Sequence, residues 1–288
     1  FLLPIGKEDN FEGYVDCVGM QGFIYKDGKK EEAEIYEDKK ERIEKLREQI
    51  LEVVAETSEE LLDKYFGGEE ISQKEIIEAL ATRVKIGEIT PVLLGSATKN
   101  IGITNLLEML LAFLPKPDEL KPLKGINPKT DEAASRKTIA DEPFSGYVFK
   151  TVIDPFVGAI NYIKINSGIL KSGQEFVVDD SNKAEKIGAL FILSGKKQLA
   201  VDEVMAGDIC AVSKLDSIYT GQTLSDPRNP IIYPKVEVLK PTIYKALTPK
   251  SRQDEDKISN ALTRLNIEDP SFETIRNKET NQLLIGGL

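Results

Sequence analysis

Apolar residues follow two different spacings along this chain of 288 residues. Between residues 43 and 84 they recur every three or four positions, which is the period of amphipathic helices. From residue 144 to residue 239 they form short runs separated by glycine-containing turns, which is typical of strands. Residues 11–36 also predict two or three small strands. The pattern therefore predicts a multidomain α+β protein with a helical front and a strand-rich second half.

The helical front carries its own start and stop signals. The apolar pattern from Ile43 to Tyr65 predicts a long helix that ends at Gly67-Gly68, because glycine accepts the left-handed conformation found after a helix. Ser72 and Glu75 have the spacing of a capping box, which predicts a second helix that stops near Gly87.

A strand, a loop and a helix are predicted next. The apolar run Ile89–Leu94 predicts a buried strand, and residues 95–100 form the loop. The helix that follows, up to Pro115, should bury a stripe made of Ile103, Leu106, Leu107, Leu110, Leu111 and Leu114. Ligands bind at such loops in α/β folds.

Within this loop, Ser96 and Ala97 are the candidate ligand contacts. Small side chains let a base approach the backbone, and Ser96 has a hydroxyl and an N–H to offer to a carbonyl oxygen. The alternative is an ordinary strand-to-helix connection with a capping serine.

The remaining chain divides into three parts. Residues 116–140, rich in proline, lysine and aspartate, predict a linker. Residues 141–240 predict a β-barrel, with the clearest strands at 147–149, 160–165, 176–178, 187–193 and 209–212. Residues 241–288 predict a strand, a helix with an inner stripe at Ile258, Ala261, Leu262 and Leu265, and two further strands. This order is the opening of a ferredoxin-like domain, with no residues left for its second helix and last strand.

Charge and cysteine content narrow the classes of partner. The net charge is −10, and residues 1–140 hold 28 acidic against 20 basic residues. A protein that binds DNA or RNA by bulk phosphate neutralisation would be basic, so no DNA partner is expected and any RNA contact should be local. The acidic front is either a solvated helical face or a docking surface for a basic partner. Two distant cysteines, and no apolar run long enough for a membrane span, favour a cytoplasmic protein.

Several catalytic chemistries are excluded by residue type. The chain has no histidine, which removes Ser-His-Asp and Cys-His catalysis and the commonest zinc ligand. The phosphate-binding pattern is absent, since the Gly28 and Gly195 segments lack its first glycine and its final hydroxyl residue. Asn277-Lys278-Glu279-Thr280 only superficially resembles a guanine-specificity motif. No catalytic or metal-binding residue is predicted.

Four segments in this order and spacing resemble elongation factor G. They are Asp154–Gly158, Ser167–Gly173 and Ala206–Val212 in the predicted barrel, and Gly95–Asn100, which is similar to the last guanine-nucleotide motif of translational GTPases. The resemblance implies an insertion subdomain and the end of a GTP-binding domain over residues 1–115, a second-domain barrel, and the first part of a third domain. The phosphate loop, the switch motif and the Asn-Lys-x-Asp motif are missing, so an internal fragment is expected.

The resemblance also implies a function for the whole protein. Such factors use GTP and Mg²⁺ on the ribosome and drive translocation, and Ser96 and Ala97 are the only residues carried over to nucleotide contact. This chain alone is expected to hold no cofactor and to be inactive. The barrel is expected to touch small-subunit rRNA, and the acidic front to meet the ribosomal stalk protein. The alternative is a non-enzymatic adaptor, a ribosome- or protein-binding barrel with an acidic helical docking arm.

Some positions resemble elongation factor G-like paralogues more than the housekeeping factor. They are Glu185–Gly188 and Gly195–Gln198, together with Gln222, which stands where aspartate is usual.

Overall fold

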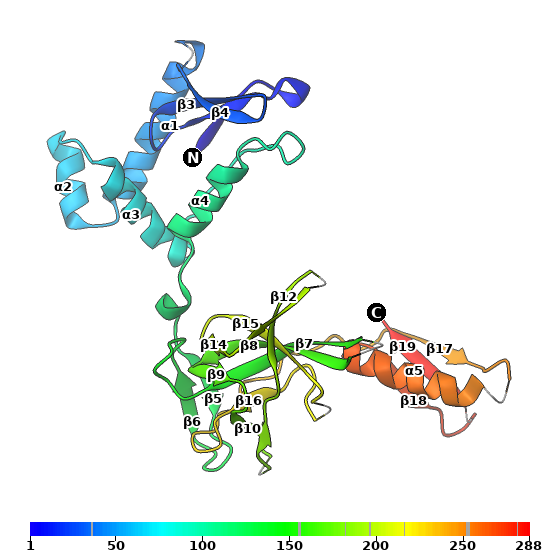
Figure 1. Ribbon diagram of the computed structural model, residues 1–288. Coiled ribbons are helices and arrows are strands. Elements are labelled where there is room, and N and C mark those ends of the chain that lie inside the picture. Colours follow the sequence, from blue (N-terminus) through cyan, green and yellow to red (C-terminus); the bar gives the residue numbers. More distant parts are fainter. Residues whose placement is uncertain are drawn as a thin grey trace. The chain divides into compact units, whose positions relative to one another are not determined.

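The computed structural model describes residues 1–35, 37–154, 157–181, 183–195, 197–215, 217–251, 254–280 and 282–288 (Figure 1). Pro155 and Phe156, which belong to one of the barrel motifs, lie outside these residues. Contacts divide the chain into two units, Phe1–Pro115 and Lys116–Leu288.

Unit 1 combines an antiparallel sheet with helices. The sheet has the order β1-β2-β3-β4, with a 3-10 turn η1 between β1 and β2. The elements are β1 (Leu2–Ile5), η1 (Glu8–Asn10), β2 (Gly13–Asp16), β3 (Gln21–Lys26), β4 (Lys29–Ala33), α1 (Glu37–Ala55), α2 (Glu59–Gly67), α3 (Gln73–Lys85) and α4 (Ile103–Phe113). One face of the sheet packs on α1 through Leu3, Val15 and Ile43, all buried. The small strands predicted near residues 11–36 are β2, β3 and β4.

The single helix predicted from Ile43 to Tyr65 is two helices. The chain leaves α1 after Ala55, and Ser58 begins α2 by accepting a hydrogen bond from the N–H of Leu61 at 3.3 Å. A serine oxygen competes with the helical backbone for such donors, which explains the break inside a continuous apolar pattern. The end at Gly67-Gly68 is as predicted, with Gly68 left-handed at φ 72°.

Ion pairs and caps hold the α2–α3 corner. The predicted capping box is present, because Ser72 Oγ accepts from the N–H of Glu75 at 3.3 Å and Glu75 Oε2 accepts from the N–H of Ser72 at 2.9 Å. The other carboxylate oxygen of Glu75 lies 2.5 Å from Lys64 Nζ. The Lys64 ammonium, and then the Ser72 hydroxyl and N–H, lower the pKa of Glu75 to about 2.

Two expectations for residues 89–114 are wrong. Residues Ile89–Leu94 form no strand among the described residues, and none of them is buried. The leucine stripe of α4 is exposed as well, with Leu107 56% and Leu111 86% accessible, whereas Phe113 on another face is buried. A strand needs a hydrogen-bonding neighbour and an apolar stripe needs a cover, and no described element supplies either.

Unit 2 is built mainly of strands. An eight-stranded sheet has the order β11-β10-β16-β7-β8-β15-β12-β13, and β9 pairs separately with β14. The strands are β7 (Ser145–Asp154), β8 (Gly158–Ser167), β9 (Ile169–Lys171), β10 (Glu175–Val178), β11 (Glu185–Lys186), β12 (Leu190–Ser194), β13 (Lys197–Val201), β14 (Glu203–Met205), β15 (Ile209–Ser213) and β16 (Thr223–Ser225). The predicted barrel is present as this curled sheet, although Ile187, Gly188 and Ala189 lie outside the strand expected there.

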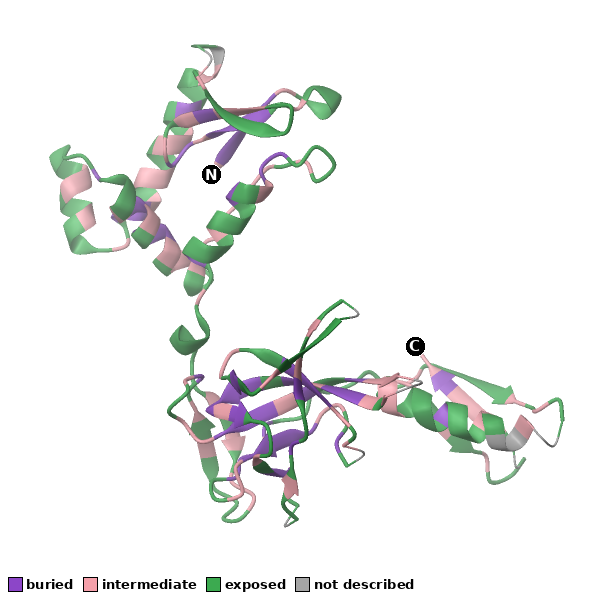
Figure 2. Ribbon diagram, viewed as in Figure 1, coloured by how far each residue is buried: buried purple, intermediate pink, exposed green. Residues whose placement is uncertain are grey.

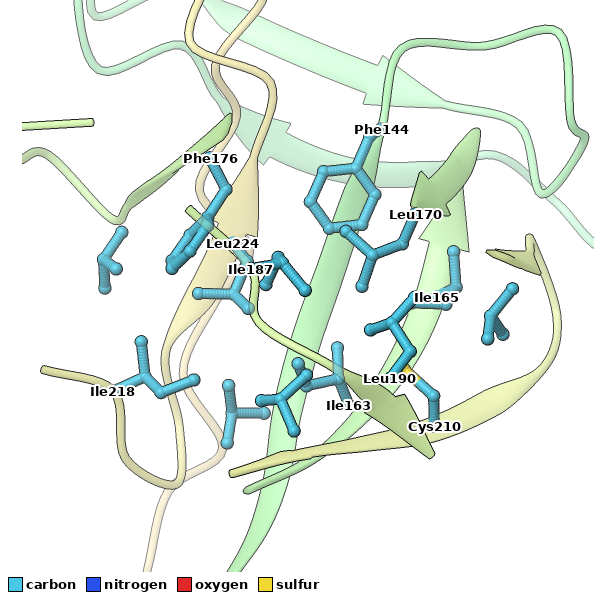
Figure 3. Close-up of a cluster of buried hydrophobic side chains, with 14 residues drawn as sticks. Phe144, Ile163, Ile165, Leu170, Phe176, Ile187, Leu190, Cys210, Ile218 and Leu224 are labelled. Atoms are coloured by element: carbon cyan, nitrogen blue, oxygen red, sulfur yellow. The ribbon is translucent and has the colours of Figure 1, made fainter. Parts of the chain in front are cut away.

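One core fills the curl of this sheet (Figure 3). Side chains from the strands and from the loops meet there, and all of them are buried: Phe144, Val148, Ile163, Ile165, Leu170, Phe176, Val178, Ile187, Leu190, Val204, Cys210, Val212, Ile218 and Leu224. Burying one large side chain of this kind contributes about 1.5–3 kcal/mol. Figure 2 shows that buried residues of unit 2 concentrate in these strands.

The stretch 116–140, expected to be a linker, contains regular structure. A 3-10 turn (η2, Pro117–Glu119) precedes a hairpin of β5 (Leu123–Ile126) and β6 (Ala133–Arg136). Ile126 exchanges two backbone hydrogen bonds with Ile232, at 3.0 and 2.9 Å. The proline and charged residues mark turns and an exposed hairpin in this stretch.

The C-terminal residues form a small sheet with one helix. The elements are β17 (Ile243–Leu247), α5 (Asp254–Glu268), β18 (Glu273–Arg276) and β19 (Leu283–Gly287), and the sheet order is β17-β19-β18. This strand, helix, strand, strand order agrees with the predicted opening of a ferredoxin-like domain. Leu262 of α5 is buried, whereas Ile243 of β17 is 60% exposed.

Among the helices described, α1 to α5, none has the length and apolar content that a bilayer crossing requires.

Glu75→Gln should destabilise unit 1 at neutral pH, because it removes the ion pair with Lys64. The carboxylate has a lowered pKa in the folded state, so its stabilisation is present above the ordinary value near 4.5 and is lost as pH falls towards about 2. Urea unfolding, followed by helical circular dichroism, should show a difference from the parent chain at pH 7 that shrinks at pH 3. Glu41→Gln, which removes an exposed carboxylate of α1, should unfold like the parent. A Glu75→Gln difference that does not change with pH would contradict the ion pair.

Candidate functional site

The loop between residues 95 and 102 is closed by its own backbone. The N–H of Ser96 donates to the carbonyl of Ile101 at 2.9 Å, and the N–H of Ile101 donates to the carbonyl of Ser96 at 3.0 Å. The loop therefore behaves as a small closed ring of backbone directly before α4.

Ser96 makes hydrogen bonds within the loop through its backbone N–H and its hydroxyl. Its N–H is used by Ile101, and its hydroxyl accepts from the N–H of Lys99 at 3.3 Å and lies 3.3 Å from Thr98 Oγ1. Among the described residues, no hydrogen bond uses the N–H of Ala97, and this residue is exposed. The structure therefore leaves the Ala97 N–H and the Ser96 hydroxyl, but not the Ser96 N–H, to meet an incoming base.

Lys99 anchors the loop to the rest of unit 1. Its ammonium donates to the backbone carbonyl of Asp9 and, at 3.5 Å, to that of Phe11. The only lysine of the loop is therefore engaged with backbone oxygens of the η1 region. It is not placed to neutralise a phosphate group.

Gly102 joins the loop to α4 and has a positive φ, a backbone conformation that is unfavourable for residues other than glycine. Its φ is +75°, and a Cβ at this position would lie 2.6 Å from the carbonyl oxygen of Leu94. Gly102 is also the N-cap of α4. Among the described residues, the first N–H groups of α4 therefore have no side-chain cap, and the start of the helix carries a partial positive charge.

These features fit one edge of a base better than a whole nucleotide. Exposed N–H groups and a serine hydroxyl match a carbonyl oxygen on a ring. A triphosphate needs a backbone cradle, a lysine and a metal ion, and the sequence has no phosphate loop. In the part of the chain that the structure describes, no three acidic or cysteine side chains gather to hold a metal.

The described residues of the barrel motifs lie in strands and in the turns beside them. Asp154 Oδ1, at the end of β7, accepts from the N–H of Val157 at 2.9 Å. Gly168 has φ +70°, and a Cβ there would lie 2.6 Å from the carbonyl oxygen of Glu142. Gln222 is buried, and its Oε1 accepts from the N–H of Tyr219 at 2.8 Å. The side-chain amide of Gln222 thus supplies an oxygen acceptor, as the shorter carboxylate of the aspartate usual at this position would.

An aromatic and basic patch on β7 and β8 was missed in the sequence. The pairing slips between Val148 and Lys150, so Phe149 is an extra residue opposite β8. A bulge of this kind redirects side chains. The Phe149 and Tyr162 rings have centroids 6.2 Å apart, and Lys150 Nζ lies 5.9 Å from the Tyr162 ring. The regular alternation of side chains along a strand would place Phe149 and Lys150 on opposite faces of the sheet. The sequence pattern therefore could not predict this patch, which depends on the bulge.

Three glutamates of the acidic front are aligned along α1. Glu44, Glu48 and Glu52 of α1 are all exposed and follow one another at four-residue spacing. Residues spaced in this way lie above one another on the same side of a helix. They therefore form a continuous acidic stripe along α1.

Two segments of unit 2 match models of known protein families. Residues 143–227 match the family model described as elongation factor G domain 2, and residues 238–288 match that of elongation factor G domain III. A crystal structure of a protein from Thermus thermophilus is similar over 99% of this chain, with 31% sequence identity and a TM-score of 0.82. The chain spans 41% of the length of that protein.

Gly102→Ala should destabilise unit 1 more than Gly87→Ala. Both positions have positive φ, and Gly87 has no atom within 4 Å of an added Cβ, so Gly87→Ala measures the backbone strain alone, about 1–2 kcal/mol. Gly102→Ala adds the clash with the Leu94 carbonyl. The unfolding free energies of the two variants, from denaturant titrations, should differ by more than about 1 kcal/mol in this order. Equal losses would mean that the loop relaxes freely around residue 102.

Proposed function

Because the chain is elongation factor G-like, we propose that it forms part of a translational GTPase that acts on the ribosome during elongation. Its domain 2 lies at residues 143–227, and its domain III sequence lies at residues 238–288. The observation that carries this proposal is the order of parts on one chain. A loop suited to the edge of a base comes before the barrel, the barrel comes before domain III, and one structure with a TM-score of 0.82 is similar over 99% of this chain.

We propose that the Ala97 N–H and the Ser96 hydroxyl contact the guanine of GTP in the whole protein. The support is the closed loop, its exposed N–H group and the uncapped start of α4. Mg²⁺ and the phosphate groups require residues that this chain does not contain. The bound nucleotide would supply the energy of hydrolysis that drives translocation, and the residues of this loop would only hold and orient the base.

The barrel is proposed to touch small-subunit rRNA through the patch formed by Phe149, Lys150 and Tyr162. Phe149 is exposed and Tyr162 is partly exposed; aromatic rings at a surface stack on unpaired bases, and a lysine beside them can meet a phosphate. Such a contact is local and does not require a basic protein, which fits the net charge of −10. A ribosome-bound role would also make the protein cytoplasmic.

The acidic stripe of α1 is proposed to bind the basic C-terminal domain of the ribosomal stalk protein. Charge complementarity of this kind mainly raises the association rate and weakens with salt. The three stripe glutamates are exposed, so a partner can reach them without unfolding the helix.

The 288-residue chain alone should bind GTP more weakly than about 100 μM, which corresponds to about −5.5 kcal/mol. Two contacts to the base cannot replace the backbone cradle, lysine and metal that neutralise the triphosphate. Calorimetry on the purified chain measures this directly. The natural whole protein should bind GTP and hydrolyse it faster when ribosomes are added. Saturable binding to the chain below about 100 μM, or a whole protein indifferent to ribosomes, would contradict the proposal.

Reversing Glu44, Glu48 and Glu52 to lysine should slow association with the stalk domain at low ionic strength. We expect a fall of about tenfold or more in the association rate, because electrostatic steering contributes roughly 10-fold to 1,000-fold. The matched control reverses Glu175, Glu203 and Glu237, which are exposed glutamates of unit 2, and produces the same change in net charge. Stopped-flow kinetics at several salt concentrations compare the two. Equal rates for both triple variants would leave the stripe as a solvated surface only.

A further inference from the structure

The barrel has a pocket of about 520 Å³ beside the start of β12 and the end of β15. All of its lining residues lie between residues 157 and 215, inside the segment 143–227 that matches the domain 2 model. No residue near either end of this sequence takes part in it. The volume is within the range of about 300–1,000 Å³ that is usual for small-molecule sites.

The floor of this pocket is mainly apolar. It is formed by Val157, Phe191 and Leu215, which are all partly buried, with the partly buried Ser213 beside them. Aliphatic and aromatic side chains in a partly enclosed site favour a ligand with an apolar or ring-shaped body. The Ser213 hydroxyl can donate one hydrogen bond to a polar group on that body.

The rim of the pocket is cationic. It contains Lys186, Gln198 and Lys214, which are all exposed, and no acidic side chain is found among the described lining residues. Lys186 Nζ lies 3.7 Å from Glu175 Oε1, and both side chains of this pair are more than half exposed, so the pair is weak and its ammonium can turn to a ligand. An anionic group is therefore favoured at the rim.

Lys214 is held in an unusual conformation. Its φ is +61°, in the left-handed region, where a lysine costs stability that a glycine would not. Strain of this kind is often kept where a side chain has a functional role. In the described part of the chain, Lys214 forms no ion pair. Its ammonium is therefore available to an anion.

Backbone donors add to the two lysines. Gly188 and Ala189 also line the pocket, and both are exposed. No hydrogen bond between described residues uses the N–H of either one. Ammonium groups bind phosphate as point charges, and free backbone N–H groups supply further donors to its oxygens. Phosphate, which has more acceptor oxygens than a carboxylate, matches this number of donors better.

We propose that this pocket binds a small phosphate ester whose organic part is a ring or a comparable apolar group. The ring lies against Phe191 and Leu215, and the phosphate meets the ammonium groups of Lys186 and Lys214. The site is separate from the aromatic and basic patch on β7 and β8, and it does not rest on the ribosomal role proposed above.

Phenyl phosphate is the probe, and NMR titration of the isotope-labelled chain measures its Kd. Binding should be saturable, should weaken as salt is added, and should be tighter than that of inorganic phosphate or benzyl alcohol, each of which carries only one part of the proposed chemistry. Absence of saturable binding up to about 10 mM would overturn the proposal. Inorganic phosphate that binds as tightly as phenyl phosphate would also overturn it, because the apolar floor would then contribute nothing.

Replacing both Lys186 and Lys214 with glutamine should weaken phenyl phosphate binding about fivefold or more, because two charge contacts are lost. The matched control replaces Lys171 and Lys245 with glutamine. These are exposed lysines of unit 2 outside the pocket lining, and this control should bind like the parent. Equal weakening in both double variants would mean attraction to the net charge alone and would contradict the assignment.

Gly188→Leu tests the position of the site without changing the charge. A Cβ at Gly188 would have no atom within 4 Å, and φ there is not positive, so the variant should fold. The leucine should occupy part of the pocket and weaken phenyl phosphate binding severalfold. Gly287→Leu, at a glycine with the same two properties outside the lining, should bind like the parent. An unchanged Kd in Gly188→Leu would place the ligand elsewhere and refute the site.

A nucleotide of RNA carries the same chemistry, a phosphate beside a ring, so a short oligouridylate forms a second arm of the test. The lysine double variant should bind it like the parent, because the proposed ligand is a free small molecule. Weaker oligouridylate binding with phenyl phosphate binding unchanged would make the pocket an RNA contact and overturn the proposal.

Discussion

The antiparallel pairing of β7 with β8 is the contact on which unit 2 depends. Both strands have ten residues, and they stay paired from Ser145 and Ser167 down to the turn at Asp154 and Gly158. They lie at the centre of the eight-stranded sheet, with β16 beside β7 and β15 beside β8. Because every other strand of that sheet joins through these two, their register decides which side chains reach the core.

The same pairing determines what the barrel shows to solvent. Val148 and Ile163, directly opposite each other, are fully buried in the core. One residue further, the bulge at Phe149 changes the alternation and brings an aromatic ring and a lysine beside Tyr162. The bulge at Phe149 in the β7–β8 pairing thus separates the side chains that pack in the core from those proposed to contact RNA.

In unit 1 the helix junctions combine an apolar core, which includes Val54, Leu80 and Phe113, with ion pairs at its edge. Arg83 of α3 donates to the carbonyl of Val53 at 2.8 Å and pairs with Glu56 at 3.1 Å and Glu88 at 3.0 Å. Lys64 of α2 and Glu75 of α3 form another ion pair, at the α2–α3 corner. These ion pairs add to the apolar packing between α1, α2 and α3, and the acidic stripe of α1 is exposed.

The sequence by itself determined the features that arise from neighbouring residues. The capping box at Ser72 and Glu75, the left-handed end at Gly68 and the helix at residues 103–113 all follow from local hydrogen bonds and backbone preferences. The strand-rich second half, and the resemblance that led to elongation factor G, rested likewise on local motifs.

The tertiary structure decided the features that depend on partners distant in sequence. Among the described residues, 89–94 have no strand beside them, and Leu111 of α4 is exposed. An apolar sequence pattern could not predict either finding, because it does not specify which other element packs against it. Only the closed loop showed that Ile101 takes the N–H of Ser96 and leaves that of Ala97. The bulge at Phe149 likewise arises from pairing between strands, which local spacing does not encode.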